Sequence, residues 1–501
     1  SMTGHFTDPE IVADGGVHHG AAAARNAVVS EDARRELVDV LSGVSPSDRI
    51  FLKAAAGAGK SYALTRLVAE ADAHSDCRHI AVVAFTNKQV HPLALNLGRA
   101  LGADRVCLLS ASDRLPDIPP EVSAAATVVT SASQIPATTR VVVGTCSRLG
   151  VPGERSRLLS QLGAGANGSR PFDVLFVDEA WQIPNHLFDQ VSGLAPKWVA
   201  VGDVGQLPPL EVGENPWRGD SAYNPYRAWP TEWDGDSRTW ARELPSVWRP
   251  AAGHLALWRA FYPEWERLDC VAAPDDRSLD FTSMPEGVDE VWRQVGTGVP
   301  TLLEVDGLPE PEAADVDRPL MEFVEALLDE FFASDVGLLT ADYDDNGAPA
   351  GQISVRSPGD VGSDPIVAIL ATRNQAVDDA ADVVERLREK HHLTEHDLVS
   401  STVDSYQGRT NLITVAVHPL NGAAELDSFN SAFGRLAVTC TRATHGLLLV
   451  ARPGLDDLLQ EAPARPGTPF GEPGNRQLPR QTHQRILATF AQGQIDVSED
   501  E

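Results

Sequence analysis

Residues 50–61 read Ile-Phe-Leu-Lys-Ala-Ala-Ala-Gly-Ala-Gly-Lys-Ser, and this stretch decides the fold class. The apolar run at its start is typical of a strand that is buried on both faces. A glycine-rich loop at 54–61 follows the strand and opens a helix. Strand, loop and helix in this order predict a parallel α/β sheet with a ligand site where the strand ends.

The loop has the residues that bind a phosphate chain. Gly57 and Gly59 let backbone N–H groups turn toward a phosphate, and the N-terminus of the next helix adds a favourable dipole. Lys60 supplies a compact positive charge for the β- and γ-phosphates, and Ser61 supplies an oxygen ligand for Mg²⁺. The usual first glycine of such a loop is Ala54 here. We predict that the nucleotide contacts are Gly57, Ala58, Gly59, Lys60, Ser61 and Tyr62.

Working outward, short β-branched runs alternate with helix-like stretches in two groups. The first group is Ile50–Ala54, Ile80–Phe85, Thr139–Gly144, Val174–Val177 and Trp198–Gly202. The second group is Pro365–Ala371, Leu398–Val403, Asn411–Val417 and Gly446–Ala451, with an amphipathic helix predicted over 374–391. This alternation predicts two tandem α/β domains, each with a parallel sheet.

Two carboxylates follow the predicted strand Val174–Val177. Because parallel strands end at one edge of a sheet, Asp178 and Glu179 are expected beside the phosphate loop. Asp178 would hold the Mg²⁺ shell, and Glu179 would orient or deprotonate an attacking water.

Composition excludes several classes of protein. The chain has 501 residues and is 43% hydrophobic, but it contains no apolar run long enough to cross a membrane. Five widely spaced cysteines exclude a disulfide framework, so we expect a cytoplasmic protein. A net charge of −30 argues against a surface that coats nucleic acid, although a local basic groove is compatible with it.

We expect four regions along the chain. Residues 1–25 lack apolar periodicity and are expected to be mobile, with a helix beginning near 31. Residues 26–245 form the first domain and 246–455 the second. Residues 456–501 read as a tail rich in proline, glycine and arginine, with a short helix near 481–492.

Residues 304–345 carry fourteen acids and one base, Arg318, and are read as an insertion in the second domain. Apolar residues from Leu320 to Phe331 form a helical stripe within it. One interpretation is a solvated helix packed on the second domain. The other is an acidic arm that docks a protein partner or mimics nucleic acid.

Aromatic residues are concentrated in the middle of the chain. All ten tryptophans lie between Trp181 and Trp292, and residues 217–240 interleave aromatic residues with arginines. The segment either packs against the domains or stacks on the bases of a single strand.

Further strings give the chain a family resemblance. They are Ala84-Phe85-Thr86-Asn87-Lys88-Gln89, Val143-Gly144-Thr145, the DEAxQ string at 178–182, the GDxxQLPP string at 202–209, Val247-Trp248-Arg249-Pro250, residues 369–375, residues 403–409 and residues 437–443. In this order the strings resemble superfamily 1 helicases, over roughly residues 45–455. The branch that they resemble most contains the nonsense-decay and senataxin-type enzymes.

The resemblance implies two RecA-like P-loop domains with an ATP site in the cleft between them. Gln206 would sense the γ-phosphate, and Gln407 and Gly408 would contact the nucleotide. Arg249 and Arg442 would serve as arginine fingers from the second domain, because charge that develops on the γ-phosphoryl group calls for rigid cations.

The resemblance also implies a groove for single-stranded nucleic acid, in which hydroxyl, amide and cationic groups contact phosphates and sugars. The residues expected to line this groove are Thr86, Asn87, Lys88, Thr145, Pro208, Pro209, Thr372, Arg373 and Thr402. Lysine is rare in this chain, so its presence at Lys60 and Lys88 favours a specific role at both positions.

The sequence therefore predicts a monomeric helicase or translocase that uses ATP and Mg²⁺ on single-stranded nucleic acid, with DNA slightly favoured over RNA. Only about fifty residues separate Lys88 from the strand at 139, which leaves little room for strand-separating insertions. One alternative is therefore a nucleic-acid-stimulated ATPase that does not unwind. Another is an ATP-switched module that binds a protein through 304–345.

Overall fold

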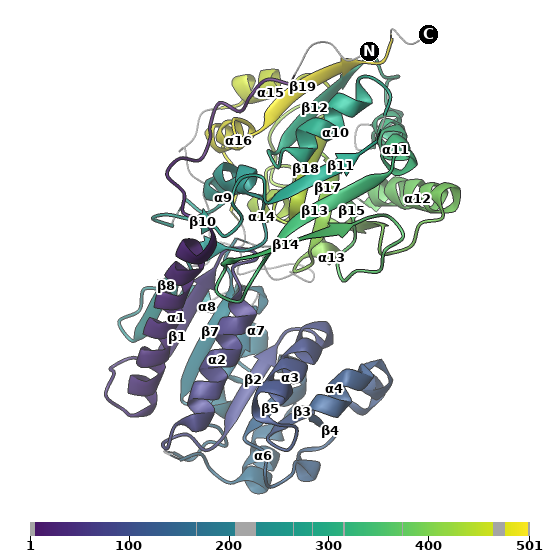
Figure 1. The fold of residues 1–501 in the computed structure, drawn as a ribbon. Coiled ribbons are helices and arrows are strands. Elements are labelled where there is room, and N and C mark those ends of the chain that lie inside the picture. The colour runs from purple at the N-terminus through teal and green to yellow at the C-terminus, as the bar shows by residue number, and fades with distance from the viewer. Residues whose placement is uncertain are drawn as a thin grey trace. The chain divides into compact units, whose positions relative to one another are not determined.

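The structure is a computed structural model that describes residues 6–166, 168–205, 227–263, 265–282, 284–313, 316–372, 374–463 and 476–498. The predicted site residues Gln206, Pro208, Pro209 and Arg373 lie outside these ranges, as does the aromatic segment up to Tyr226. The chain divides into two units (Figure 1). The N-terminal unit comprises 26–204 and 208–244, and the C-terminal unit comprises 1–25, 205–207 and 245–501.

The N-terminal unit is built on eight parallel strands in the order β4-β3-β5-β2-β6-β7-β1-β8. Their bounds are β1 Arg49–Ala54, β2 Ile80–Ala84, β3 Val106–Leu109, β4 Thr127–Val129, β5 Val141–Thr145, β6 Val174–Asp178, β7 Lys197–Asp203 and β8 Thr239–Glu243. The five strands predicted for this half are confirmed. The sequence missed β3, β4 and β8, because two are very short and β8 is an edge strand with polar, half-buried residues.

Helices cover this sheet, and Figure 1 shows α2 and α3 running side by side along it. The helices are α1 His19–Leu41, α2 Lys60–Ala73, α3 Asn87–Leu101, α4 Pro120–Ala125, α5 Cys146–Leu149, α6 Glu154–Leu162, α7 Asn185–Phe188 and α8 Pro230–Trp233. Parallel strands need crossover connections, and these helices provide them.

The N-terminal residues differ from the prediction. The helix expected near 31 begins at His19, because the alanine-rich run before it favours a helix without any apolar periodicity. Ala22 and Ala23 are buried against Val271, and Thr7 pairs with Gln492. The structure thus gives residues 6–25 fixed partners in the C-terminal unit, where we expected a mobile segment.

Trp229, in the described part of the aromatic segment, packs in the core. The Trp229 side chain is 0% exposed, and its ring stacks on Phe188 with centroids 3.7 Å apart. Phe51 and Trp198 meet the same ring edge-on at 5.6 and 5.8 Å. A ring enclosed in this way cannot stack on a nucleobase, so the packing interpretation holds for Trp229.

The C-terminal unit contains a second parallel sheet of six strands in the order β16-β15-β17-β18-β12-β19. Its strands are β12 Thr301–Asp306, β15 Val367–Ala371, β16 Leu398–Thr402, β17 Asn411–Val417, β18 Ala443–Ala451 and β19 Ala491–Asp496. Two smaller sheets accompany it, formed by β9 Ser246–Val247 with β10 Asp269–Cys270, and by the antiparallel strands β11 Arg277–Phe281, β13 Val336–Tyr343 and β14 Pro349–Arg356. The four predicted strands of this half are confirmed.

The helices of this unit are α9 Leu255–Phe261, α10 Val288–Gly296, α11 Arg318–Ala333, α12 Asn374–His391, α13 Val403–Tyr406, α14 Phe433–Cys440, α15 Leu455–Glu461 and α16 Arg480–Leu487. Two parallel sheets with covering helices confirm the predicted α/β class, with two RecA-like domains. All five cysteines are buried and free. No helix among the described residues is long and apolar enough to cross a membrane.

The acidic stretch 304–345 forms regular elements of the C-terminal unit and not a separate insertion, and the interpretation of a helix packed on the second domain is confirmed by α11. It contains the end of the sheet strand β12, the core helix α11 and the strand β13. The apolar stripe of α11 lies in the hydrophobic core of the unit. Its acidic face is paired with basic residues of α12, since Glu325 binds Arg386 at 2.6 Å and Asp329 binds Lys390 at 2.9 Å. The sequence suggested an acidic arm because the basic residues that pair with these acids lie about sixty residues further along the chain.

The predicted tail is also part of the fold. The helix expected near 481–492 is α16, but it ends at Leu487, and β19 then pairs in parallel with β12 at the edge of the sheet. The sequence of β19, Ala-Gln-Gly-Gln-Ile-Asp, has little strand propensity of its own. Pairing with β12 therefore determines its conformation.

Candidate nucleotide-binding site

The candidate site lies at the carboxyl edge of the N-terminal sheet. Because all eight strands are parallel, β1, β2, β5, β6 and β7 end at this same edge. Ala54 at the end of β1 stands in register with Asp203, and Asp178 at the end of β6 stands in register with Val201. The register therefore brings the phosphate loop and the DE pair to one edge.

The loop has the backbone conformation that the sequence predicts. Gly57 and Gly59 have φ values of 64° and 81°, in the left-handed region that favours glycine. Gly59 is the N-cap of α2, and no described side chain caps that helix by a hydrogen bond. The first N–H groups of α2 are therefore available to an anion, and the helix dipole favours one there.

Lys60 lies between the two predicted carboxylates. Its Nζ is 3.4 Å from Asp178 Oδ1 and also forms an ion pair with Glu179 Oε1. Burial disfavours the charged ammonium, but the two carboxylates outweigh it and hold the pKa of Lys60 above its ordinary value. Lys60 thus stays charged at all physiological pH values.

Glu179 is held in a constrained position. Its backbone φ is 50°, which is unusual for a residue other than glycine. One carboxylate oxygen pairs with Lys60, and the other accepts a hydrogen bond from Gln182 Nε2 at 3.3 Å. Gln182 is the last residue of a 3₁₀ turn that begins at Ala180, directly after β6. The strained turn aims Glu179 back toward the phosphate loop.

The residues fit a nucleotide with Mg²⁺. The Ser61 hydroxyl and the Asp178 carboxylate are hard oxygen donors, which Mg²⁺ prefers, and the phosphates and water complete its shell in sites of this kind. The described residues contain no group of three His, Cys, Asp or Glu side chains that could hold a metal ion.

Sequence reasoning missed three residues at this edge. Asn26 Nδ2 donates to the carbonyl of Ala58 at 3.2 Å and so supports the phosphate loop from α1. Gln89 Nε2 donates to Gln182 Oε1 at 3.1 Å. The pattern Thr86-x-x-Gln89 is a readable capping box, but no sequence signal connects Gln89 to Gln182 or Asn26 to the loop.

Three predicted nucleic-acid contacts serve as helix N-caps. Thr86 caps α3, Thr145 caps α5 and Thr402 caps α13, each accepting a backbone hydrogen bond through its hydroxyl oxygen. A capping hydroxyl keeps its own O–H for another partner. Lys88 is exposed and forms no ion pair with any described residue, so its charge is available to a phosphate.

In the C-terminal unit, three of the predicted motifs meet where β17 and β18 begin. Arg249 donates to Thr410 Oγ1 at 3.1 Å and to the carbonyl of Thr441 at 2.8 Å. Arg442 is 1% exposed, and it donates to Thr441 Oγ1 at 3.2 Å and to the carbonyl of Arg409 at 3.3 Å. Within their unit, both guanidinium groups are thus held around Thr441.

The adjoining motif residues have features that suit a ligand. Gly408 has a φ of 82°, and the buried Nε2 of Gln407 has no hydrogen-bond partner among the described residues. A buried donor of this kind is costly unless a partner satisfies it. The nucleotide contact predicted for Gln407 would satisfy it.

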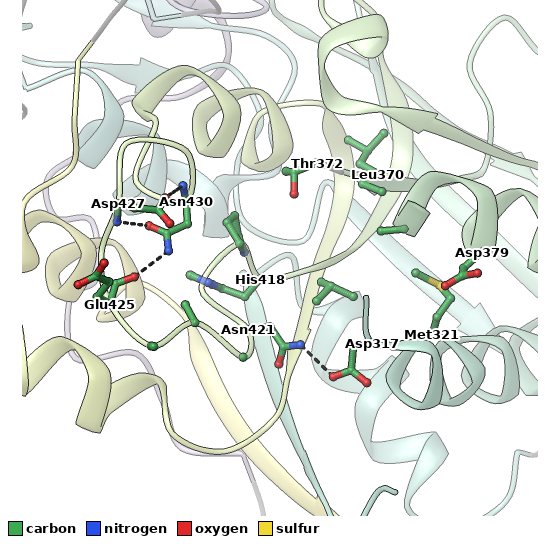
Figure 2. A pocket seen from close by; sticks show the side chains of 17 residues that line it. Asp317, Met321, Leu370, Thr372, Asp379, His418, Asn421, Glu425, Asp427 and Asn430 are labelled. Atoms are coloured by element: carbon green, nitrogen blue, oxygen red, sulfur yellow. Dashed lines mark hydrogen bonds between the residues drawn. The ribbon is translucent and has the colours of Figure 1, made fainter. Parts of the chain in front are cut away.

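Thr372 lies apart from these motifs, at the carboxyl edge of the C-terminal sheet. It lines a cavity of about 350 Å³ at the ends of β15 and β17 (Figure 2). The polar walls of the cavity are mostly acidic or uncharged and are formed by Asp317, Asp379, His418, Asn421, Glu425, Asp427 and Asn430. Carboxylates repel phosphate, so these walls do not favour the phosphate contact predicted for Thr372.

Comparisons with known proteins find weak structural likenesses and a family match. No curated protein matches the chain. A solved structure titled "The structure of PRRSV helicase" is similar over 84% of this chain and 56% of that chain, with 15% identity and a TM-score of 0.34. Another, an arterivirus nonstructural protein 10 (helicase) in complex with DNA, is similar over 82% of this chain and 62% of that chain, with 14% identity and a TM-score of 0.40. Likeness at this level carries no function over to the chain.

A family match is more specific, although it spans less than half of the chain. Residues 39–211 match the family model described as an AAA domain. The matched stretch contains the phosphate loop, Lys60 and the DE pair, so the comparison and the geometry both identify this part of the chain as resembling a nucleotide-binding AAA domain.

Proposed function

We propose that this chain is a nucleic-acid-dependent ATPase that acts as a helicase or translocase on single strands. The observation that carries the proposal is the position of Lys60, at the uncapped N-terminus of α2 and between Asp178 and Glu179. The AAA-domain match over 39–211 supports nucleotide binding there. The helicase-type strings in both halves of the sequence support the choice of a nucleic-acid motor.

The geometry gives each residue a role. The γ- and β-phosphates replace the carboxylates as the partners of Lys60, which releases Glu179 Oε1 while Gln182 still holds Oε2. Glu179 then accepts a proton from the attacking water. Ser61 and Asp178 would hold Mg²⁺, which would supply positive charge beside the phosphates. The γ-phosphate roles of Arg249, Arg442 and Gln206 remain predictions from the resemblance.

The single strand would lie along the loop that follows β2 and the first turn of α3, where Lys88 offers an available cation and Thr86 and Asn87 offer polar groups. Lys88 supports this part of the proposal because it is exposed and forms no ion pair with a described residue. DNA is slightly favoured over RNA as the strand.

An ATPase that moves along or remodels a strand without unwinding is the second candidate. It is favoured by the short connection between α3 and β5, which holds only β3, α4, β4 and short turns. An ATP-switched module has less support, since α11 packs its apolar stripe in the core and pairs Glu325 and Asp329 with α12.

The proposal is tested by measuring steady-state ATP hydrolysis under three conditions. These are no nucleic acid, single-stranded DNA and single-stranded RNA. We expect one of the two strands to raise kcat strongly. Stimulation without strand displacement would favour the second candidate. Slow hydrolysis that neither strand changes would contradict a motor.

A further inference from the structure

A continuous chain of hydrogen bonds joins the loop after β2 to Glu179. Gln89 Oε1 accepts from the backbone N–H groups of Phe85 and Thr86 at 3.1 and 3.2 Å. Gln89 Nε2 donates to Gln182 Oε1 at 3.1 Å, and Gln182 Nε2 donates to Glu179 Oε2 at 3.3 Å. The two amide side chains, ninety-three residues apart in sequence, thus connect the segments that follow β2 and β6.

Every bond in the chain runs in the same direction. Each amide accepts at its oxygen from the loop side and donates from its nitrogen toward Glu179. Such a chain polarises cooperatively, and the last donor faces a carboxylate, where hydrogen bonds are strongest. The hydrogen bond from Gln182 therefore favours one orientation of the Glu179 carboxylate.

The two ends of the chain have different surroundings. Glu179 lies beside Lys60 at the phosphate loop, whereas Phe85 and Thr86 are exposed and directly precede Asn87 and Lys88. Gln89 also completes the capping box of α3, since its backbone N–H donates to Thr86 Oγ1 at 3.3 Å. Any shift of the backbone at 85–86 therefore moves the Gln89 amide.

We propose that Gln89 and Gln182 form a relay by which a strand bound at 86–88 sets the orientation of Glu179. The inference rests on the proposed function and adds two positioning residues to it. A strand on this loop fixes the backbone at 85–86, Gln89 then holds Gln182, and Gln182 holds Glu179 toward the attacking water. A misplacement of about 1 Å can cost up to about a hundredfold in rate, so a small change in this contact is enough to couple the two sites.

The decisive variant is Gln89→Glu. Glutamate keeps an oxygen that accepts from Phe85 and Thr86, but it cannot donate to Gln182. We expect the ratio of strand-stimulated to unstimulated kcat to fall about fivefold or more, with the KM for ATP and the affinity for single-stranded DNA unchanged. Gln182→Met, which keeps length without polar atoms, should lower kcat in the same way.

Gln134→Glu is the matched control. Gln134 Oε1 likewise accepts from a loop backbone, the N–H of Thr130 at 3.0 Å, but no described contact joins it to Glu179. This variant should keep the wild-type ratio. The double variant Gln89→Glu, Gln182→Met should lose no more than the larger single loss, because both changes break one chain.

The relay is overturned if Gln89→Glu keeps the wild-type ratio. It is also overturned if the ratio falls only because strand affinity falls, or if the double variant is additive. A wild-type chain that no strand stimulates would contradict the proposed function instead, and the unstimulated kcat of Gln182→Met then still shows whether Gln182 orients Glu179.

Discussion

The carboxyl edges of the two parallel sheets share a topology but differ in their chemistry. At the N-terminal sheet, one lysine is shared by Asp178 and Glu179 beside left-handed glycines and an uncapped helix. At the C-terminal sheet, a cavity of about 350 Å³ is lined by carboxylates, amides and the buried His418. One of these carboxylates, Asp317, forms an ion pair at 2.6 Å with Arg452, which does not line the cavity.

The difference shows what a parallel sheet contributes and what it does not. The topology brings several loops to one edge, where a ligand can bind. The sequences of those loops then decide which ligand the edge favours. A positive helix end and a lysine favour phosphate, whereas walls rich in carboxylates disfavour it.

The strongest test of this contrast makes the same substitution at both edges. Glu179→Gln should lower kcat for ATP by about 10²–10⁴-fold, because it removes the general base, while ATP still binds. Glu425→Gln, in the acidic cavity, should leave kcat unchanged. Steady-state hydrolysis and equilibrium nucleotide binding check both variants. Full activity in Glu179→Gln would refute its role, and a similar loss in Glu425→Gln would remove the contrast.

His418, which lines the acidic cavity, should make the free energy of unfolding depend on pH. Burial, with a smaller contribution from His483, lowers the pKa of His418 to about 3. The unfolded chain binds this proton near pH 6.5, so stability from His418 is complete above that value and is lost as the pH falls toward 3. At pH 5 the loss is about 2 kcal/mol.

His418→Asn should therefore reduce the fall in unfolding free energy between pH 7 and pH 5 by about 2 kcal/mol. Asparagine Oδ1 can still accept from the backbone N–H of Leu420, which His418 Nδ1 does at 3.0 Å. His392→Asn is the control, since His392 is exposed and asparagine tolerates its φ of 56°. Denaturant unfolding at both pH values provides the measurement, and equal pH dependence in the two variants would contradict a buried neutral His418.

A smaller change in stability tests whether Thr402 only caps α13 or also binds the nucleic-acid strand. Thr402→Ala should cost about 1 kcal/mol, because the side chain accepts from the N–H of Ser405 at 3.0 Å as the cap of α13. Thr402→Ser keeps the hydroxyl and should restore both stability and strand affinity. If Thr402→Ala loses stability but binds single strands normally, Thr402 is a cap alone.

The smallest expected effect concerns Lys88, the exposed cation at the start of α3. Lys88→Ala should weaken single-strand binding severalfold and reduce the salt slope of log K by about 0.7, the value for one phosphate contact on a single strand. Lys390→Ala is the control, because Lys390 is already paired with Asp329. A salt titration of fluorescence anisotropy would show this, and an unchanged slope in Lys88→Ala would place the strand elsewhere.

Prediction from sequence succeeded where the pattern is local. Residues 50–61 form the strand, loop and helix that their glycines and apolar run require, and all nine predicted strands are present. It failed where a segment takes its structure from distant partners. The acids of α11 are neutralised by α12, and β19 becomes a strand because β12 offers an open edge.

The sequence by itself thus determined the α/β class, the phosphate loop and the DE pair, because backbone conformation and strand burial follow from neighbouring residues. Only the tertiary structure decided that Lys60 joins both carboxylates, that Asn26 supports the loop and that Gln89 reaches Gln182. These contacts depend on the register of parallel strands and on the helices packed over them. No short stretch of sequence records that register, since it is set when the whole sheet assembles.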